Sequence, residues 1–219
     1  MNKYVAEFIG TFALVFCGTG AIVVNSVSEG AITHAGIAAV FGLIVLVMIY
    51  ALGPISGAHF NPAVTIAFAV AKRFELREIG PYILSQTGGA FLASFCLWMM
   101  FPFHTDLGST IPVGSYGRSF TLELIMTFFL MFVIMQVSSG SKEQGMFAGL
   151  AIGATVLLEA MFAGPISGAS MNPIRSLSPA VMSGTFEGLW IYMTAPFAGS
   201  ILAVAVSGLM KAQSLNKNA

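Results

Sequence analysis

The sequence predicts an all-α membrane protein with six transmembrane helices and two short half-helices, built as an inverted three-plus-three repeat. Of its 219 residues, 57% are hydrophobic and only 8% are charged, whereas ordinary globular domains carry about 25% charged residues. A chain with so few charges cannot cover a water-facing surface. Two copies of one Gly- and Pro-rich motif, one in each half of the chain, predict the repeat.

The charge balance and the cysteines exclude several other classes of protein. Nine basic and nine acidic residues cancel, which gives no basis for binding nucleic acid. Cys17 and Cys96 are too few for a disulfide framework, and neither has the spacing of a metal site. The first apolar run is too long for a signal peptide and no A-x-A cleavage site follows it, so we expect a retained transmembrane helix.

The length of each apolar stretch decides which ones cross the membrane. A span needs about 20 mainly apolar residues. Two stretches, Asn61–Ala71 and Asn172–Ser183, are apolar but too short to cross. The six predicted spans are Tyr4–Val24, His34–Leu52, Tyr82–Phe101, Phe120–Val137, Met146–Phe162 and Leu189–Met210.

The basic residues predict the orientation of the chain. If six helices cross, Arg118 lies in a loop on one side and nearly all other basic residues lie on the opposite side. By the positive-inside rule, both termini are then cytoplasmic. The residues on the cytoplasmic side are Lys3, Lys72, Arg73, Arg77, Lys142, Lys211 and Lys217.

The internal repeat covers most of the chain. GPISGAHFNPAV begins at Gly53, and the near copy GPISGASMNPIR begins at Gly164, 111 residues later. Upstream of each, AEFIGTF at Ala6–Phe12 resembles LELIMTF at Leu122–Phe128. Three spans per half is an odd number, so the second half is inverted. We therefore expect one domain, 1–219, with halves of about 1–105 and 116–219 and a functional site at the midplane where interrupted helices meet.

Each repeated motif predicts a half-helix that begins inside the membrane. Irregular backbone is tolerated at that depth only where protein buries it or where it lines a cavity. Each GPISGA segment is expected to enter the membrane as extended chain. A helix should then start at Asn61-Pro62 and at Asn172-Pro173, because Asn is a favoured N-cap and Pro is favoured in the first turn.

Two opposed half-helices would select for neutral, polar molecules. Each N-terminus carries about half a positive charge, so a pair of them repels cations. The side-chain amides of Asn61 and Asn172 supply donors, and backbone carbonyls of about Ile55–Phe60 and Ile166–Met171 supply acceptors. A molecule that both donates and accepts hydrogen bonds can then pass in single file.

These two Asn-Pro boxes, NPAVT at Asn61–Thr65 and NPIRS at Asn172–Ser176, resemble the aquaporin (major intrinsic protein) family over essentially the whole chain. The resemblance implies a multi-pass channel in the cell membrane, assembled as a homotetramer with one pore per protomer and no cofactor. Its partners would be the lipid bilayer and small uncharged solutes. The boxes themselves are Asn61, Pro62, Ala63, Asn172, Pro173 and Ile174; the family has Ala where this chain has Ile174, and we expect a modest change of packing.

The resemblance also implies an outer selectivity filter. An arginine inside the membrane is costly and indicates function, and Arg175 occupies the place of the family's filter arginine. By their distance from the boxes, Phe41, Ala160 and Ala169 match the other three filter positions. Water-selective members have His where this chain has Ala160, so this filter should be wider than that of a strict water channel.

The predicted solutes follow from that width. Glycerol facilitators usually have Asp after the filter arginine and a second aromatic wall, whereas this chain has Ser176 and only Phe41. The motif GPISGASMNP and the small residue at 160 resemble the nodulin-26-like branch and its bacterial aquaglyceroporin-type relatives. That resemblance implies passage of water with glycerol, urea or metalloid hydroxides such as arsenite. A strict water channel is the alternative.

Several other polar residues in apolar surroundings need an interpretation. Glu7 and Glu123 occupy matching places in the two halves and are expected to accept hydrogen bonds from the re-entrant backbone. His59, just before the first box, is expected to fix the geometry of that loop. Glu159 could balance Arg175, bind a backbone group or face the outer rim.

An ion channel or ion-coupled transporter is the main alternative class. Such a protein would need carboxylates along its pathway, and Glu159 is the sole candidate. An intramembrane enzyme is less consistent with the sequence, which has no Ser/His, Asp/Asp or HExxH arrangement.

Overall fold

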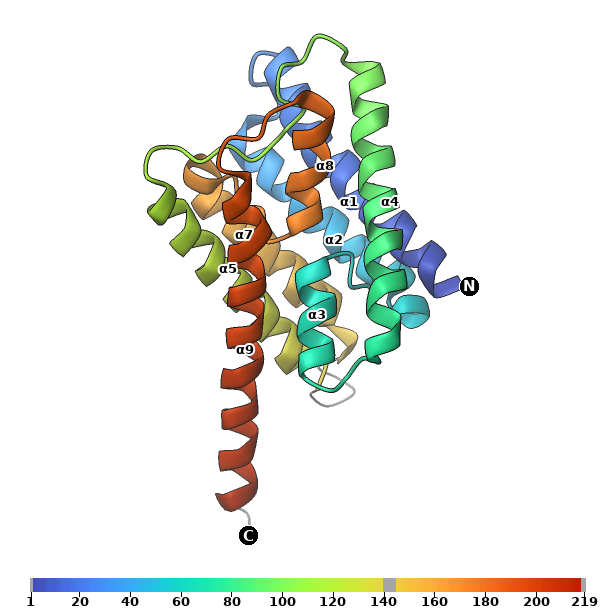
Figure 1. The fold of residues 1–219 in the computed structure, drawn as a ribbon, viewed down its shortest axis with the longest axis vertical. Helices are drawn as coiled ribbons and strands as arrows, with labels where there is room; N and C mark the ends of the chain where they lie inside the picture. Colours follow the sequence, from blue (N-terminus) through green and yellow to red (C-terminus); the bar gives the residue numbers. More distant parts are fainter. Residues whose placement is uncertain (1, 140–144, 218–219) are drawn as a thin grey trace.

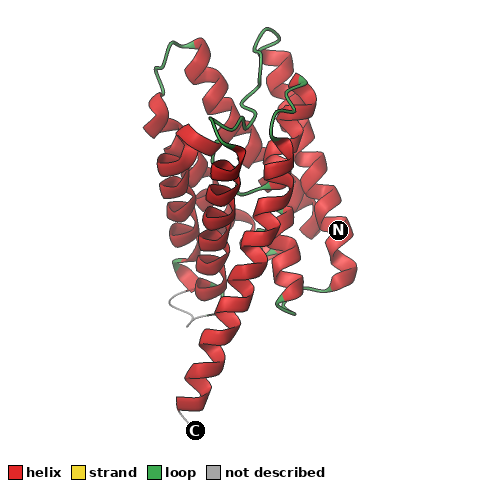
Figure 2. Ribbon diagram, turned by 60° about the vertical axis from the view of Figure 1, so that its left-hand side comes forward, coloured by secondary structure: helices red, strands yellow, loops and turns green. Residues whose placement is uncertain are grey.

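A computed structural model describes residues 2–139 and 145–217 of the chain. Within these residues the chain forms eight helices and no strand (Figures 1 and 2). The helices are α1 (Asn2–Val27), α2 (Thr33–Ser56), α3 (Pro62–Val70), α4 (Leu76–Met100), α5 (Tyr116–Val137), α7 (Ala148–Ser167), α8 (Pro173–Ser183) and α9 (Leu189–Lys217).

The six predicted spans are confirmed, since six of these helices are long and apolar enough to cross a membrane. The other two, α3 with 9 residues and α8 with 11, reach only about 14 and 17 Å at 1.5 Å per residue. The hydrocarbon core of a bilayer is about 30 Å thick. Figure 1 shows α8 above α3 in the interior of the bundle, so the two half-helices together make one crossing.

The extended segments are shorter than the sequence predicts. Helices α2 and α7 continue through Pro54 and Pro165 to Ser56 and Ser167, so the expectation that GPISGA enters the membrane extended is wrong for its first four residues. A proline removes only one hydrogen bond of a helix, which the last turn of each helix tolerates. Both helices end at a glycine with positive φ, +85° at Gly57 and +80° at Gly168, in the left-handed C-cap that favours glycine.

Glycines allow the closest helix pairs to form. A Cβ on Gly89 of α4 would lie 2.2 Å from the carbonyl oxygen of Phe8 in α1, and one on Gly199 of α9 would lie 2.2 Å from that of Leu124 in α5. These two contacts occupy matching places in the two halves. Small residues let membrane helices approach in this way when no hydrophobic effect drives them together.

The two halves also pack on each other through glycines. A Cβ on Gly42 of α2 would lie 2.6 Å from the carbonyl oxygen of Gly153 in α7, and the reverse distance is also 2.6 Å. Helices α2 and α7 therefore cross with their backbones in direct contact. This contact joins the first repeat to the second.

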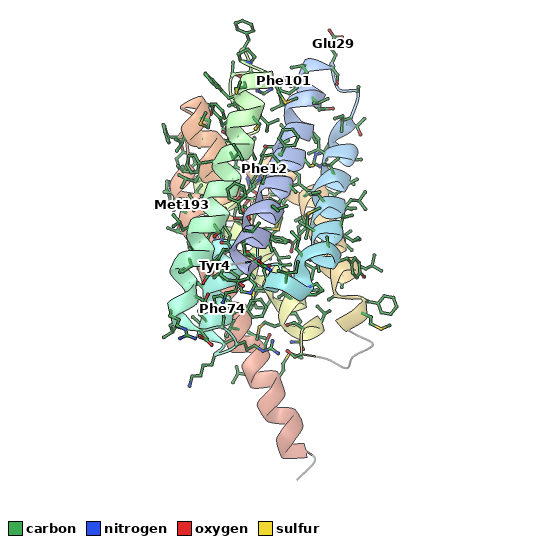
Figure 3. The ribbon with its side chains drawn as sticks, turned by 90° about the vertical axis from the view of Figure 1, so that its right-hand side faces the viewer. Tyr4, Phe12, Glu29, Phe74, Phe101 and Met193 are labelled. Atoms are coloured by element: carbon green, nitrogen blue, oxygen red, sulfur yellow. The ribbon has the colours of Figure 1, made fainter. Side chains whose placement is uncertain are left out.

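Basic residues gather at one end of the bundle, which we call the basic end. There Lys3 pairs with Glu78 at 2.9 Å, and Arg73 donates to the hydroxyl of Ser138 at 3.2 Å. Figure 3 shows Tyr4 and Phe74 at this end and Glu29 and Phe101 at the other. Lys142 lies outside the described residues, as do the side chains of Lys211 and Lys217.

Candidate functional site

A cavity of about 560 Å³ runs through the interior from the basic end toward the opposite end. Both repeats contribute to its walls. Tyr50, Ser138 and Met146 line it near the basic end, and Phe41, Ala169 and Arg175 line its far part. Asn61 and Asn172 also line it, so the N-termini of both half-helices face one continuous space.

Each half-helix starts as the sequence predicts. The backbone of Asn61 is extended and its side-chain oxygen accepts from the backbone N–H of Ala63 at 2.9 Å. Asn172 does the same for Ile174 at 3.2 Å and Arg175 at 3.4 Å. Each asparagine is an N-cap followed by proline in the first turn. The positive end of both helix dipoles therefore points at the cavity.

The two asparagines also connect the two repeats. The Nδ2 atom of Asn61 donates to the carbonyl oxygen of Met171 at 2.8 Å, and that of Asn172 donates to the carbonyl oxygen of Phe60 at 2.9 Å. An amide nitrogen carries two hydrogens. Each asparagine thus uses one hydrogen to hold the opposite loop and keeps the second for the cavity.

Glu7 holds the loop between α2 and α3 from behind. It is fully buried, and its carboxylate accepts from the Ser56 hydroxyl at 2.7 Å and from the backbone N–H groups of His59 and Phe60 at 2.9 and 2.8 Å. The side-chain amide of Gln86 adds a fourth bond at 2.8 Å. Charged groups are buried at this depth only when hydrogen bonds compensate for lost water.

Glu123 makes the corresponding contacts in the second half. It is also fully buried, and it accepts from the Ser167 hydroxyl at 2.8 Å and from the backbone N–H groups of Ser170 and Met171 at 2.9 and 2.8 Å. Tyr192 donates to the carbonyl oxygen of Ser167 at 2.6 Å. The two glutamates therefore hold both loops by the same pattern of bonds.

Both loops contain residues in an unfavourable backbone conformation. Ala58 and Phe60 have φ of +53° and +50°, and Ala169 and Met171 have +43° and +53°. Residues with a side chain rarely adopt positive φ, and such strain persists only where surrounding contacts impose it. Here the glutamates and the two cross-connections impose it, and the alternating conformation keeps the chain from becoming helical before the asparagine.

Arg175 is the largest side chain that is almost completely buried, with 1% exposure. Its Nη1 donates to the carbonyl oxygen of Gly108 at 3.0 Å, and its Cζ lies 4.9 Å from the centre of the Phe41 ring. Within the described residues its Nε has no hydrogen-bond partner. The guanidinium is therefore held on one side by the loop after α4 and on another by an aromatic face.

The remaining two predicted filter residues are both small and buried. Ala169 lines the cavity beside Arg175, whereas Ala160 is buried in the same apolar cluster as Phe41 but is not among the residues of the cavity wall. The structure thus brings Phe41, Ala169 and Arg175 together at the far part of the cavity. Ala160 lies on α7 and outside the cavity wall.

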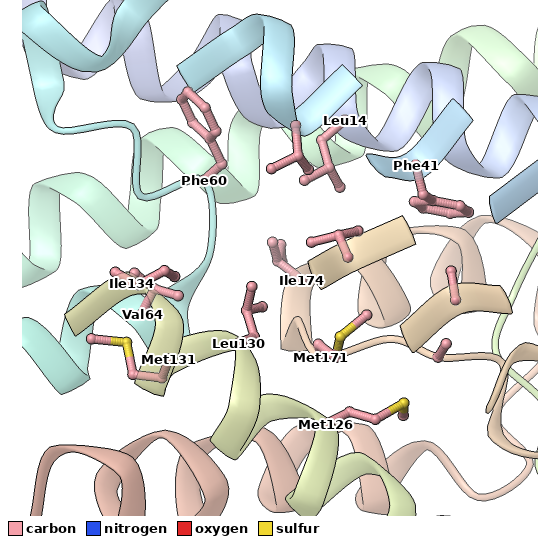
Figure 4. Packing of buried hydrophobic residues seen from close by; sticks show 14 of the residues in the cluster. Leu14, Phe41, Phe60, Val64, Met126, Leu130, Met131, Ile134, Met171 and Ile174 are labelled. Atoms are coloured by element: carbon pink, nitrogen blue, oxygen red, sulfur yellow. The ribbon is translucent and has the colours of Figure 1, made fainter. Parts of the chain in front are cut away.

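The position of the Phe41 ring depends on α1. A Cβ on Gly18 would lie 2.2 Å from the Phe41 ring, and one on Gly10 would lie 2.0 Å from the Phe60 ring. Figure 4 shows Leu14 between these two aromatic rings, with Leu130 and Ile174 across from them. Glycines two turns apart on α1 therefore make room for one aromatic side chain from α2 and one from the loop before α3.

Ile174, the departure from the family's second box, packs rather than bonds. Its side chain is 4% exposed and belongs to the main apolar cluster (Figure 4). Only its backbone N–H takes part in the cap of α8. The box therefore keeps its hydrogen bonds with isoleucine in place of alanine.

The sequence suggests that a buried Glu159 balances Arg175 or binds a backbone group. The structure shows neither contact in the part of the chain that it describes. Glu159 is 9% exposed, and within the described residues neither carboxylate oxygen has a hydrogen-bond partner. It forms no ion pair with Arg175 and no bond to a loop backbone there. It also does not line the cavity.

The residues that support the loops from the side are not among those that the sequence predicts. Gln86 and the serines Ser56 and Ser167 bind the two buried glutamates, and Gly108 holds Arg175. The serines carried a signal, since both stand at the same place of the repeated GPISGA motif. Gln86 and Gly108 lie in parts of the chain with no repeated motif.

The profile of the major intrinsic protein family matches residues 1–207 of this chain. The chain belongs to that family. Aquaporin NIP1-1 from Zea mays is 47% identical over 212 residues, which cover 96% of this chain and 75% of that protein. Nodulin-26 from Glycine max is also 47% identical over 212 residues, covering 96% of this chain and 78% of its own. The resemblance to the nodulin-26-like branch is therefore confirmed.

A solved structure shows the same fold. The aquaglyceroporin from Plasmodium falciparum superposes with a TM-score of 0.81 at 26% identity and covers 93% of both chains. Major intrinsic proteins are channels and not enzymes. This chain is accordingly a multi-pass membrane channel for water and small neutral solutes such as glycerol.

Proposed function

We propose that Phe41, Ala160, Ala169 and Arg175 form the selectivity filter and that it admits urea and neutral metalloid hydroxides as well as water and glycerol. Three of these residues line the far part of the cavity, and none of the four adds a second aromatic wall. The observation that carries the proposal is Ala160, a small apolar residue that is buried in the same cluster as Phe41. A larger, polar side chain at this position would narrow the filter.

The same site excludes ions. Two half-helix N-termini and the Arg175 guanidinium place positive charge along the path, so a cation meets an unfavourable potential. The buried carboxylates of Glu7 and Glu123 are occupied by the loop backbone, which leaves them no capacity for a permeating cation. Asn61 and Asn172 then orient single-file molecules from the middle of the pore.

The filter assignment is tested in proteoliposomes with Ala160→His. We expect the glycerol permeability to fall about tenfold or more, because the larger side chain excludes the larger solute. Water permeability should change much less. Ala160→Ser, which adds only a hydroxyl, is the matched control and should retain glycerol flux. Unchanged glycerol flux in Ala160→His would show that position 160 does not limit the filter.

The wild-type protein separates the two candidate selectivities. Uptake of glycerol, urea and arsenite by stopped-flow light scattering supports the wide filter. Water uptake without any of these solutes would instead favour a strict water channel.

We further propose that the protein lies in the cell membrane with both termini in the cytoplasm and assembles as a homotetramer with one pore per protomer. The basic end, with Lys3, Arg73 and Arg77, supports this orientation. The tetramer follows from membership of the family. The chain acts as one unit, 1–219, with inverted halves of about 1–105 and 116–219.

A further inference from the structure

A row of hydrogen-bonding side chains leads from Glu7 to His59 near the basic end of the cavity. The Nε2 atom of Gln86 donates to Glu7 at 2.8 Å and to the Thr65 hydroxyl at 2.9 Å. That hydroxyl donates to the carbonyl oxygen of Asn61 at 3.0 Å. It also lies 3.1 Å from Nδ1 of His59.

The positions of the protons in this row follow from the number of bonds each group can make. A side-chain amide nitrogen has two hydrogens and no lone pair to offer, so Gln86 is a donor in both of its contacts. The Thr65 hydroxyl has one hydrogen, which it gives to Asn61, and two lone pairs. One lone pair accepts from Gln86, and the other remains for His59. All four contacts are hydrogen bonds only if Nδ1 of His59 carries the proton.

The other tautomer makes one bond fewer. If Nδ1 carried no proton, the Thr65 hydroxyl would have to turn its hydrogen toward His59 and release Asn61. The Asn61 carbonyl would keep only the backbone N–H of Thr65. In a buried site with few water molecules, the arrangement with the larger number of satisfied groups is favoured.

We propose that Gln86 and Thr65 hold His59 as its Nδ1–H tautomer, so that Nε2 is a hydrogen-bond acceptor for permeating molecules at the basic end of the pore. His59 lines the cavity together with Gly57 and Phe68. Within the described residues, Nε2 has no hydrogen-bond partner, yet it is not among the buried polar atoms that lack one. It is therefore accessible from the cavity.

Aromatic neighbours fix the plane of the His59 ring. It stacks on Phe68 with ring centres 4.8 Å apart, meets Phe74 in an edge contact at 4.9 Å, and lies tilted against Tyr82 at 5.2 Å. Tyr82 is itself held by a 2.8 Å bond to the carbonyl oxygen of Ser56. The ring cannot turn over without displacing this cluster, so Nδ1 stays on Thr65 and Nε2 stays on the cavity side.

An acceptor at the basic end suits the orientation that the central asparagines give to permeating molecules. This inference rests on the proposed function. The Asn61 and Asn172 amides donate at the centre, so a water molecule there presents its oxygen to them and its hydrogens away from them. Molecules between the centre and the basic end then need acceptors. Nε2 with a lone pair supplies one, whereas an N–H at this place would oppose that orientation.

The second repeat has no equivalent group. The residue two before its box asparagine is Ser170, whose hydroxyl lies 2.5 Å from that of Ser176 and donates to the carbonyl oxygen of Asn172 at 2.8 Å. These hydroxyls bond to one another and to the loop. The imidazole acceptor therefore belongs to the basic end alone.

The tautomer is tested by nitrogen NMR on the full-length protein in lipid, labelled with ¹⁵N-histidine. The chain has three histidines, so His34→Asn and His104→Asn identify the signals of His59. We expect a protonated Nδ1 and an unprotonated Nε2 at neutral pH. Thr65→Val, which removes the acceptor for Nδ1, should abolish this pattern, and Thr65→Ser should restore it. Protonated Nε2 in the wild type overturns the inference, and the wild-type spectrum decides this even if Thr65→Val fails to fold.

A flux measurement tests the role of the acceptor. Loss of one hydrogen bond along the path should lower water and glycerol permeability of Thr65→Val by about two- to tenfold, and Thr65→Ser should match the wild type. A changed tautomer with unchanged flux would overturn the role of Nε2. A wild type that shows the Nδ1–H tautomer but takes up water alone would sustain the tautomer and refute the proposed solute range.

Discussion

At the scale of single residues, the two buried glutamates decide whether the site can exist. Each loop before a half-helix has two non-glycine residues with positive φ, a conformation that the loop would leave without support. Glu7 and Glu123 supply that support through backbone N–H groups that have no helical partner. Neither glutamate is among the residues that line the cavity, and both are bonded to the loops that do line it.

We predict that Glu123→Leu lowers the free energy of unfolding by about 3 kcal/mol or more, since it leaves three buried donors without an acceptor. Water permeability should be lost with it, because the loop carrying Asn172 and Arg175 relaxes. Glu123→Gln keeps one acceptor oxygen, so it should retain part of the stability and part of the water permeability. Thermal unfolding in detergent and stopped-flow light scattering measure the two effects.

Glu29→Leu is the matched control, because Glu29 is exposed at the end of the bundle opposite the basic end (Figure 3). It should change neither stability nor permeability. A Glu123→Leu protein that folds and conducts like the wild type would show that the carboxylate does not support the loop.

At the scale of helices, glycines on α1 make room for two aromatic side chains that line the cavity. Gly18 and Gly10 leave recesses that the Phe41 and Phe60 rings occupy. Elsewhere, glycines such as Gly199 lie against the backbone of a neighbouring helix. A methyl group at Gly18 or Gly10 would push a side chain, whereas one at Gly199 would push a whole helix.

We predict that Gly18→Ala reduces glycerol permeability several-fold more than water permeability. The added methyl group would lie 2.2 Å from the Phe41 ring, so it should push the ring toward the cavity that the ring lines. Overpacking of this kind costs about 1–3 kcal/mol. Solute uptake and thermal unfolding of the purified variant measure both effects.

Gly208→Ala provides the comparison, because a Cβ at Gly208 of α9 would meet nothing within 4 Å. Alanine is the better helix former by about 1 kcal/mol, so this variant should be slightly stabilised with normal flux. Equal solute selectivity in the two variants would disprove the role of Gly18 in placing Phe41.

At the scale of the whole molecule, the sequence predicts the architecture better than it predicts the site. Six apolar spans and one repeated motif are long-range, redundant signals, and both are reproduced in the structure. The ends of α2 and α7 were placed too early, because Gly and Pro oppose a helix but do not end it when they lie in its last turn. The helix continues to the first residue that needs positive φ, which is Gly57 in one half and Gly168 in the other.

The supporting contacts were less predictable for a physical reason. Asn61, Asn172 and Arg175 are conspicuous because polar groups are rare in apolar sequence. Gly108 acts only through its backbone carbonyl, which every residue possesses. Glu159 shows the reverse case: it is conspicuous in the sequence, yet it makes no contact that assigns it a role in the described residues.

The proposed orientation, with both termini in the cytoplasm, predicts which surfaces an impermeant thiol reagent reaches. In a variant with Cys17 and Cys96 replaced by alanine, Phe103→Cys should be labelled in intact cells. Phe103 is 97% exposed and follows closely after Phe101, which Figure 3 shows at the end opposite the basic end. Glu75→Cys, at the basic end, should be labelled only after permeabilisation. The reverse pattern would place both termini outside the cell.

The exchange of bonds between the two loops has a consequence for biosynthesis. Asn61 needs the Met171 carbonyl, and Asn172 needs that of Phe60, so neither loop is complete while its counterpart is still on the ribosome. A nascent chain that has inserted only its first three spans lacks the cavity lining that the second repeat contributes. We therefore expect permeability to arise only when the last part of the polypeptide has joined the first.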